Sequence, residues 1–122
     1  MIRRDGLESL PVVFSAAEIQ ETASLTSDTI DQGDAVAIVL TSLLTFNVAA
    51  TAGATVEIFQ VNPEGEVDTY ASFTYSIPYV SGAQVHTEKI EIGSQKFKVK
   101  ITNDDAAEDI TAMTAGYIRM MY

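Results

Sequence analysis

The sequence predicts an all-β protein: an antiparallel β-sandwich or jelly roll of seven or eight strands with an extended N-terminal arm. Three observations support this class. Apolar residues alternate with polar ones over much of the chain, turn-forming residues recur about every 8 to 12 residues, and no long stretch has helical periodicity. At 122 residues, 47% of them apolar, the chain can bury one sizeable core. We therefore expect one sandwich domain at residues 31–122, preceded by an arm at residues 1–30.

The first thirty residues fit the strand pattern least well. Ser15 to Glu18 matches a helix capping box, but the run after it ends within two turns, which allows at most one short helix. The segment therefore predicts a mostly extended arm. Arg3 and Arg4 form a basic spot near its tip, which is either a solvated terminus or a contact to a partner.

The first long strand is predicted between Ala35 and Val48, after turn residues at 31–34. The many β-branched residues and the clean alternation favour a strand over a helix. One parity of this strand contains Val36, Ile38, Leu40, Leu44, Phe46 and Val48, and the other contains Ala35, Ala37, Thr41, Thr45 and Asn47.

A hairpin is predicted around the turn from Asn62 to Gly65. Proline fixes φ at the second turn position, and glycine accepts a positive φ after it. The strand before the turn covers residues 54–61 and the strand after it residues 67–77. In the second strand the odd-numbered residues, including Phe73 and Tyr75, share the buried face.

Three further strands complete the expected sandwich, at residues 84–92, 95–102 and 110–122. Pro78 and the cluster at 81–83 separate the first of them from the hairpin, and Gly93 ends it. The acidic stretch at 103–109 is interpreted as the solvated loop that leads into the last strand.

The segment from Gln95 to Thr102, QKFKVKIT, divides into two faces. Phe97, Val99 and Ile101 point to the core. The opposite face is a stripe of three lysines: Lys96, Lys98 and Lys100. On an edge strand such lysines prevent aggregation, and carboxylates of a neighbouring strand, for instance Glu88 or Glu91, pair with them. The alternative is that the stripe binds an acidic surface of another subunit.

The composition excludes several partners and chemistries. A formal net charge of -10 and a sequence pI near 4.2 argue against nucleic acid or an anionic membrane as the main partner. The chain has no cysteine, so thiol nucleophiles and thiolate metal sites are absent. The N-terminus lacks the apolar region of a secretory signal, and no apolar run is long enough to span a membrane. We expect synthesis in a host cytoplasm.

No catalytic, metal or cofactor site is predicted. His86 is not accompanied by a nucleophile elbow or an oxyanion loop, so it is interpreted as a surface or core histidine. The acidic cluster of Asp104, Asp105, Glu108 and Asp109 offers oxygen ligands for calcium but lacks the spacing and the glycine of a calcium loop. The chain has no tryptophan on which a sugar ring could stack, although its five tyrosines offer stacking surfaces.

Three segments carry a resemblance to a known group of proteins. They are the entry Asp31 to Asp34 into the long strand, the strand Val56 to Val61 with its turn, and Phe97 to Asp104 before the last strand. On these segments the carboxy-terminal two thirds of the chain resembles small β-sandwich proteins of tailed-phage virions, in particular capsid decoration or cement proteins. The N-terminal arm matches this group least well.

The resemblance implies a non-enzymatic virion protein that binds the major capsid protein or another virion subunit and stabilises the outer surface of the head. It also implies a homotrimer and no cofactor. We expect Arg3, Arg4 and the lysine stripe to contact the partner. The alternative is a carbohydrate- or receptor-binding module of a phage fibre or spike, and a small hydrolase is the third hypothesis.

Overall fold

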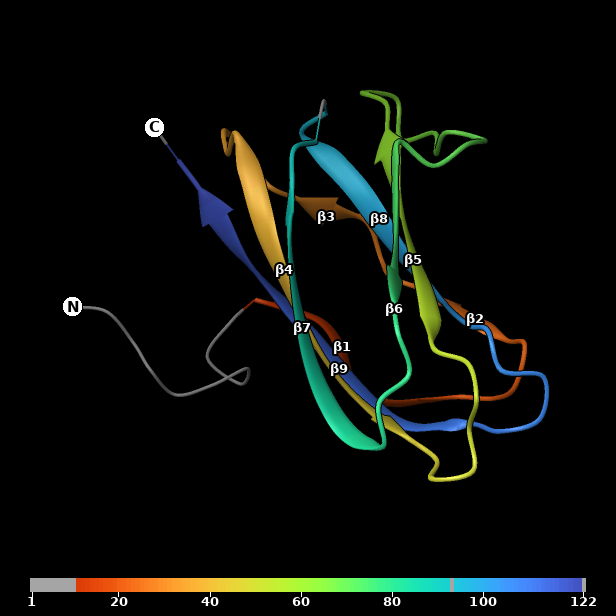
Figure 1. Ribbon diagram of the computed structural model, residues 1–122. Helices are drawn as coiled ribbons and strands as arrows, with labels where there is room; N and C mark the ends of the chain where they lie inside the picture. The colour runs from red at the N-terminus through yellow and green to blue at the C-terminus, as the bar shows by residue number, and fades with distance from the viewer. Residues whose placement is uncertain (1–10, 93, 122) are drawn as a thin grey trace.

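The computed structural model describes residues 11–92 and 94–121, apart from the Ala16 side chain, and contains nine strands and no helix within these ranges. The strands form two antiparallel sheets that pack face to face (Figure 1). This confirms the predicted all-β sandwich. No helix in these ranges is long and apolar enough to cross a membrane.

Sheet A has the strand order β1-β9-β4-β7. Its strands are β1 (Val12–Ile19), β9 (Ile110–Met120), β4 (Ala37–Phe46) and β7 (Gly82–Ile90). The pairing of β4 with β7 runs from Ile38↔Ile90 to Phe46↔Gly82 without a register shift. The pairing of β1 with β9 is interrupted by three register shifts.

Sheet B has the order β2-β8-β5-β6, with β3 paired to β8. Its strands are β2 (Ser24–Thr26), β8 (Lys96–Asn103), β5 (Ala54–Val61), β6 (Phe73–Ile77) and β3 (Ile30–Asp31). The lysine-containing strand β8 is therefore an interior strand, flanked by β5 on one side and by β2 and β3 on the other.

The core lies between the sheets and follows the predicted alternation. Phe97, Val99 and Ile101 of β8 are completely buried, as expected. The even-numbered residues of β4 from Ile38 to Phe46 are buried as well. The ring of Phe97 meets that of Tyr117 edge-on, with centroids 6.3 Å apart. Alternation along each strand thus assigns one face to the core, as in other sandwiches.

The described part of the expected arm belongs to the sandwich. From residue 12 onward the segment is extended, as predicted, but β1 pairs with β9 and β2 pairs with β8. Phe14 and Ile19 are buried, because they fill the core beside β9. The short helix considered at Ser15 does not form, since this residue lies within β1.

The hairpin around Asn62 is confirmed, but its second strand is shorter than expected. The Asn62 carbonyl accepts a hydrogen bond from the Gly65 N–H, and Gly65 has a φ of 89°. After the turn, only one isolated bridge, Val61↔Val67, forms before β6 begins at Phe73. Residues 62–70 are all exposed, so their alternating sequence has no core to face.

One close approach fixes the chain before β5. A Cβ on Gly53 would lie 1.9 Å from the carbonyl oxygen of Ile77, so only glycine fits there. The loop before β5 is thereby held against the end of β6.

Candidate functional site

The predicted lysine stripe lies on the outer face of sheet B. Lys96 is exposed, and Lys98 and Lys100 are half-buried, whereas the residues between them point into the core. β8 is an interior strand of sheet B. Protection of an exposed edge therefore does not explain the stripe. Arg3 and Arg4 lie outside the described residues.

The acidic neighbours of the stripe differ from those predicted. Glu88 belongs to β7 in sheet A, and Glu91 directly follows that strand, so neither lies on a strand beside β8. Instead, Glu57 of β5 is opposite Lys100, and Asp31 of β3 is opposite Lys96. Within the described ranges no lysine of the stripe forms an ion pair within 4.0 Å. None of the three amines is therefore held in an ion pair by another of the described residues.

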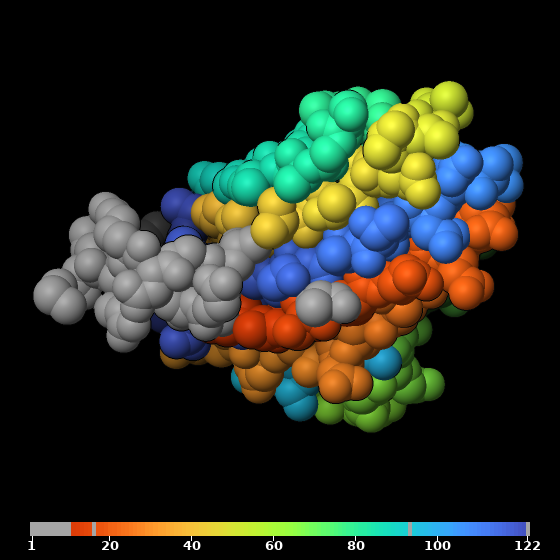
Figure 2. Space-filling view, turned by 90° about the horizontal axis from the view of Figure 1, so that it is seen from below, coloured from red at the N-terminus to blue at the C-terminus, as the bar shows by residue number. Residues whose placement is uncertain are grey.

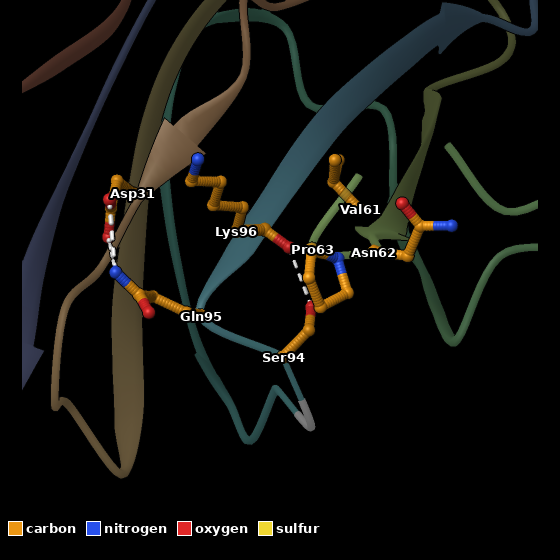
Figure 3. Close-up of a pocket in the computed structure, with 7 residues that line it drawn as sticks. All are labelled: Asp31, Val61, Asn62, Pro63, Ser94, Gln95 and Lys96. Carbon is orange, nitrogen blue, oxygen red and sulfur yellow. Dashed lines mark hydrogen bonds between the residues drawn. The ribbon is translucent and has the colours of Figure 1, made fainter. Parts of the chain in front are cut away.

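A shallow cavity of about 470 Å³ lies beside Lys96, at the end of sheet B (Figure 3). Its lining comes from Asp31, Lys96, the turn after β5 and the turn before β8. Gln95 donates two hydrogen bonds to the Asp31 carboxylate, at 2.9 and 3.1 Å, and the Gly33 N–H donates a third. These bonds, with smaller contributions from Lys96 and Arg119, lower the pKa of Asp31. The carboxylate is thus occupied by the protein itself, which gives the cavity little capacity for a ligand.

The acidic cluster after β8 has a structural role. Asp105 is buried, and its two carboxylate oxygens accept hydrogen bonds from the N–H groups of Thr51, Ala52, Ala107 and Glu108 at 2.7 to 3.0 Å. These four donors hold the pKa of Asp105 far below its usual range. Among the residues placed by the structure, no group of three or more histidine, aspartate or glutamate side chains is arranged to hold a metal ion.

His86 lies on the inner face of β7, in a row of polar side chains. Ser42, Gln84 and Glu88 belong to the same inner layer, since Ser42 is paired with His86 in the register of β4 and β7. The Nε2 atom of His86 lies 3.1 Å from Oε1 of Glu88. The imidazole stacks on the ring of Tyr75 across the sandwich, with centroids 5.4 Å apart.

Several polar atoms in this row are buried without a hydrogen-bond partner among the described residues. They are Ser42 Oγ, Tyr75 OH and Gln84 Oε1. Burial, with a contribution from Glu88, raises the pKa of Tyr75 well above its usual value, so the phenol stays protonated. Ser42 and His86 are cross-strand neighbours, but the serine hydroxyl makes no bond to the imidazole. The arrangement is therefore not a catalytic triad.

The outer face of sheet A is the most distinctive surface of the molecule. Figure 2 shows its strands as bands side by side, from β7 (teal) through β4 (gold) and β9 (blue) to β1 (red-orange). Val12, Val85 and Ile118 on this face are 55%, 62% and 50% exposed, and Val39 and Leu43 of β4 lie half-buried between them.

This outer face carries almost no charge. β4 has no charged residue, and those of the other three strands are Glu18, Glu88, Lys89 and Arg119, besides His86. Glu88 points inward, and Arg119 lies near the end of β9 beside Gly33. Val12, Val85 and Ile118 are thus exposed on a face with few charges, although the chain has a net charge of -10. Val39 and Leu43, on the second parity of the long strand, are the sequence signal for a second apolar face, which was not predicted.

Comparison with known proteins identifies the fold but no family. No protein-family model matches the chain, and no curated protein matches it. Among solved structures, VP2 of infectious bursal disease virus in a subviral particle is similar, with a TM-score of 0.51 and 12% identity over 87% of this chain and 30% of the VP2 chain. The chain thus spans less than a third of that protein.

Two further solved structures have lower TM-scores. A carbohydrate-binding module of Cellvibrio mixtus lichenase 5A, in complex with cellotriose, has a TM-score of 0.47 and 10% identity over 80% of this chain and 72% of the module. A Bacillus endospore appendage protein has a TM-score of 0.44 and 12% identity, covering 99% of both chains. At such identities the likeness to VP2 shows a shared β-sandwich fold and nothing more.

Proposed function

We propose that the chain is a non-enzymatic structural protein that binds the outer surface of a tailed-phage head and stabilises it, as a decoration or cement protein. The observation that carries this proposal is the outer face of sheet A, which has few charges and on which Val12, Val85 and Ile118 are at least half exposed. Apolar side chains exposed together on one face of a protein are typical of a binding surface.

The two outer faces of the sandwich suit different parts of a capsid subunit. Sheet A offers apolar side chains and threonines, which favour a dry contact. Sheet B offers three amines without ion pairs, which favour an acidic patch on the shell. Many weak contacts of this kind, repeated over a shell, add up to stable attachment. The sandwich fold shared with VP2, which forms a viral particle, supports the architecture of such a protein.

Co-sedimentation with undecorated phage heads tests the proposal. The protein is expected to pellet with the heads at saturable stoichiometry. The double variant Val12→Ser/Ile118→Ser removes two side chains that are about half exposed. Full burial of such a side chain stabilises by about 1.5–3 kcal/mol, so burying the exposed half of each on docking contributes about 1 kcal/mol. Loss of both side chains should therefore raise the Kd for heads about 30-fold.

A matched control is available outside sheet A. Val48 and Val67 are 83% and 44% exposed and lie in loops, so Val48→Ser/Val67→Ser removes similar apolar area elsewhere. This control should bind heads as the wild type does. Absence of the wild-type protein from the pellet would reject the decoration role, and equal affinity of both double variants would reject the assigned face.

A second candidate function is the binding of a carbohydrate or another receptor group, as in a fibre or spike module. The polar side chains between β7, β4 and β6 favour it, because Ser42, Tyr75 and Gln84 each have a buried polar atom without a hydrogen-bond partner among the described residues. Hydroxyl and amide groups of this kind are the partners that sugar hydroxyls use. Retention on a glycan array, lost in Gln84→Leu, would favour this function over head binding.

A further inference from the structure

β7 is the least protected strand edge in the described part of the molecule. Sandwich proteins usually blunt their edges with short strands, bulges, prolines or charges. The other edges have such features: β1 is broken by three register shifts, β2 has three residues, and β6 has five residues and is followed by Pro78. β7 has nine residues, an unbroken register with β4 and no proline.

The outer edge of β7 has no partner within the described ranges. Its backbone pairs with β4 on one side, and none of its residues takes part in the loop and turn hydrogen bonds. The residues that alternate on its outward face are Ala83, Val85, Thr87 and Lys89, and all four are exposed. Lys89, near the end of the strand, is the single charge among them. Several backbone N–H and C=O groups are therefore available along an edge with an unbroken register and one outward charge.

We propose that β7 pairs antiparallel with β7 of a second copy of the chain, so that two four-stranded sheets join into one of eight strands across a two-fold axis. A two-fold contact of this type is self-complementary: each strand provides the same donors and acceptors to the other. The inference is independent of head binding. It gives a dimer, whereas the resemblance to decoration proteins implies a homotrimer.

The side-chain pairs across the two strands favour one register. Centring the pair on Thr87 places His86 opposite Glu88 of the second copy, and this contact occurs twice by symmetry. Within one copy these two side chains already lie 3.1 Å apart, so the second contact extends an existing polar pair. Centring on Glu88 or Lys89 would place like charges opposite each other, which destabilises a pair of strands. On the outward face, the Thr87 register places Val85 opposite Lys89, whose aliphatic stem covers it.

Disulfide cross-linking tests the register, because the wild-type chain has no cysteine. Opposite residues of antiparallel strands have Cα atoms about 4.5–5.5 Å apart, within the range that a disulfide spans. Under mild oxidation the single variant Thr87→Cys should form covalent dimers. Thr74→Cys is the matched control, since it is also an exposed threonine on a strand, and it should remain monomeric. Cross-linking of Thr87→Cys no greater than that of Thr74→Cys would overturn the proposed pairing.

Sedimentation equilibrium of the full chain without phage heads tests the association itself. The wild type should dimerise with concentration, and Thr87→Lys should raise the dimer dissociation constant at least about tenfold, because two lysines then face each other. Val85→Lys is a second variant with the same expectation, and Thr74→Lys is the charge-matched control. A wild-type protein that stays monomeric up to the highest soluble concentration, or Thr87→Lys and Val85→Lys dimerising as the wild type does, would overturn the proposal. Failure to bind heads would leave it standing.

Discussion

Replacing Ser42 by alanine is expected to stabilise the protein. Ser42 lies on the inner face of β4, opposite His86 and Ala115, and its side chain is completely buried. Its Oγ atom has no hydrogen-bond partner among the described residues. A buried polar group without a partner costs about 1–3 kcal/mol. The void left by one oxygen is smaller than a methyl group and costs less than about 1 kcal/mol. Ser42→Ala should therefore raise the free energy of unfolding by about 1 kcal/mol.

Urea denaturation of wild type and variant measures this difference, and Ser27 provides a matched control. Ser27 is also buried, but its Oγ donates to the Asp28 carbonyl at 2.8 Å and accepts from the Val99 N–H at 2.9 Å. Ser27→Ala should lower the free energy of unfolding by about 1–3 kcal/mol. If Ser42→Ala is destabilised to a similar degree, the reasoning is refuted, because the Ser42 hydroxyl then has a partner such as a bound water or a ligand group.

Two further predictions concern charged residues. The triple variant Lys96→Glu/Lys98→Glu/Lys100→Glu should weaken binding to undecorated heads at least about tenfold. Its free energy of unfolding should fall by no more than about 2 kcal/mol, because the variant places like charges opposite Glu57 and Asp31, at about 0.2–1 kcal/mol for each pair. Unchanged binding in a co-sedimentation titration would assign the stripe to solvation alone. Since four N–H donors lower the pKa of Asp105, its ionised form stabilises the fold above the unfolded pKa of about 3.9, and this contribution is lost as the pH falls toward the folded pKa. Asp105→Asn should be less stable than wild type at neutral pH, and its stability should fall less steeply than that of wild type below pH ~4. Acid titrations followed by circular dichroism measure both effects. Parallel titration curves for the two proteins would contradict the role of these donors.

Residue alternation predicted the faces of the long strands correctly. In β8 the residues Phe97, Val99 and Ile101 are core and the lysines are outside, because successive side chains of a strand point to opposite faces. The same rule identified β4, and the residues 62–65 predicted the turn after β5. These features depend on neighbours in the sequence, so local pattern is sufficient to find them.

Strand order and partner choice could not be predicted in the same way. β8 is interior because it pairs with β5 on one side and with β2 and β3 on the other, and these contacts join segments far apart in the sequence. Carboxylates near β8 in sequence, such as Glu88, therefore lie in the other sheet. Residues 67–72 have the alternating polarity of a strand but do not form one, since a single bridge is all that joins this segment to the sheet.

The candidate surfaces needed the structure because alternation does not say which face is buried when both faces are similar. In β4 both parities are largely apolar, and only the sandwich shows that Val39 and Leu43 point outward. In β7 the inner row contains Gln84, His86 and Glu88, whereas the outer row contains Ala83 and Val85. An inference from polarity alone would reverse the two faces of this strand.

Thiol labelling of a single cysteine tests the central claim, that the outer face of sheet A is the surface that docks on a phage head. Ile118→Cys places the chain's only thiol on this face, and Val48→Cys places it in a loop outside both sheets. We predict that saturating undecorated heads slow the reaction of Ile118→Cys with a maleimide and leave that of Val48→Cys unchanged. Equal labelling rates of Ile118→Cys with and without heads would contradict the claim.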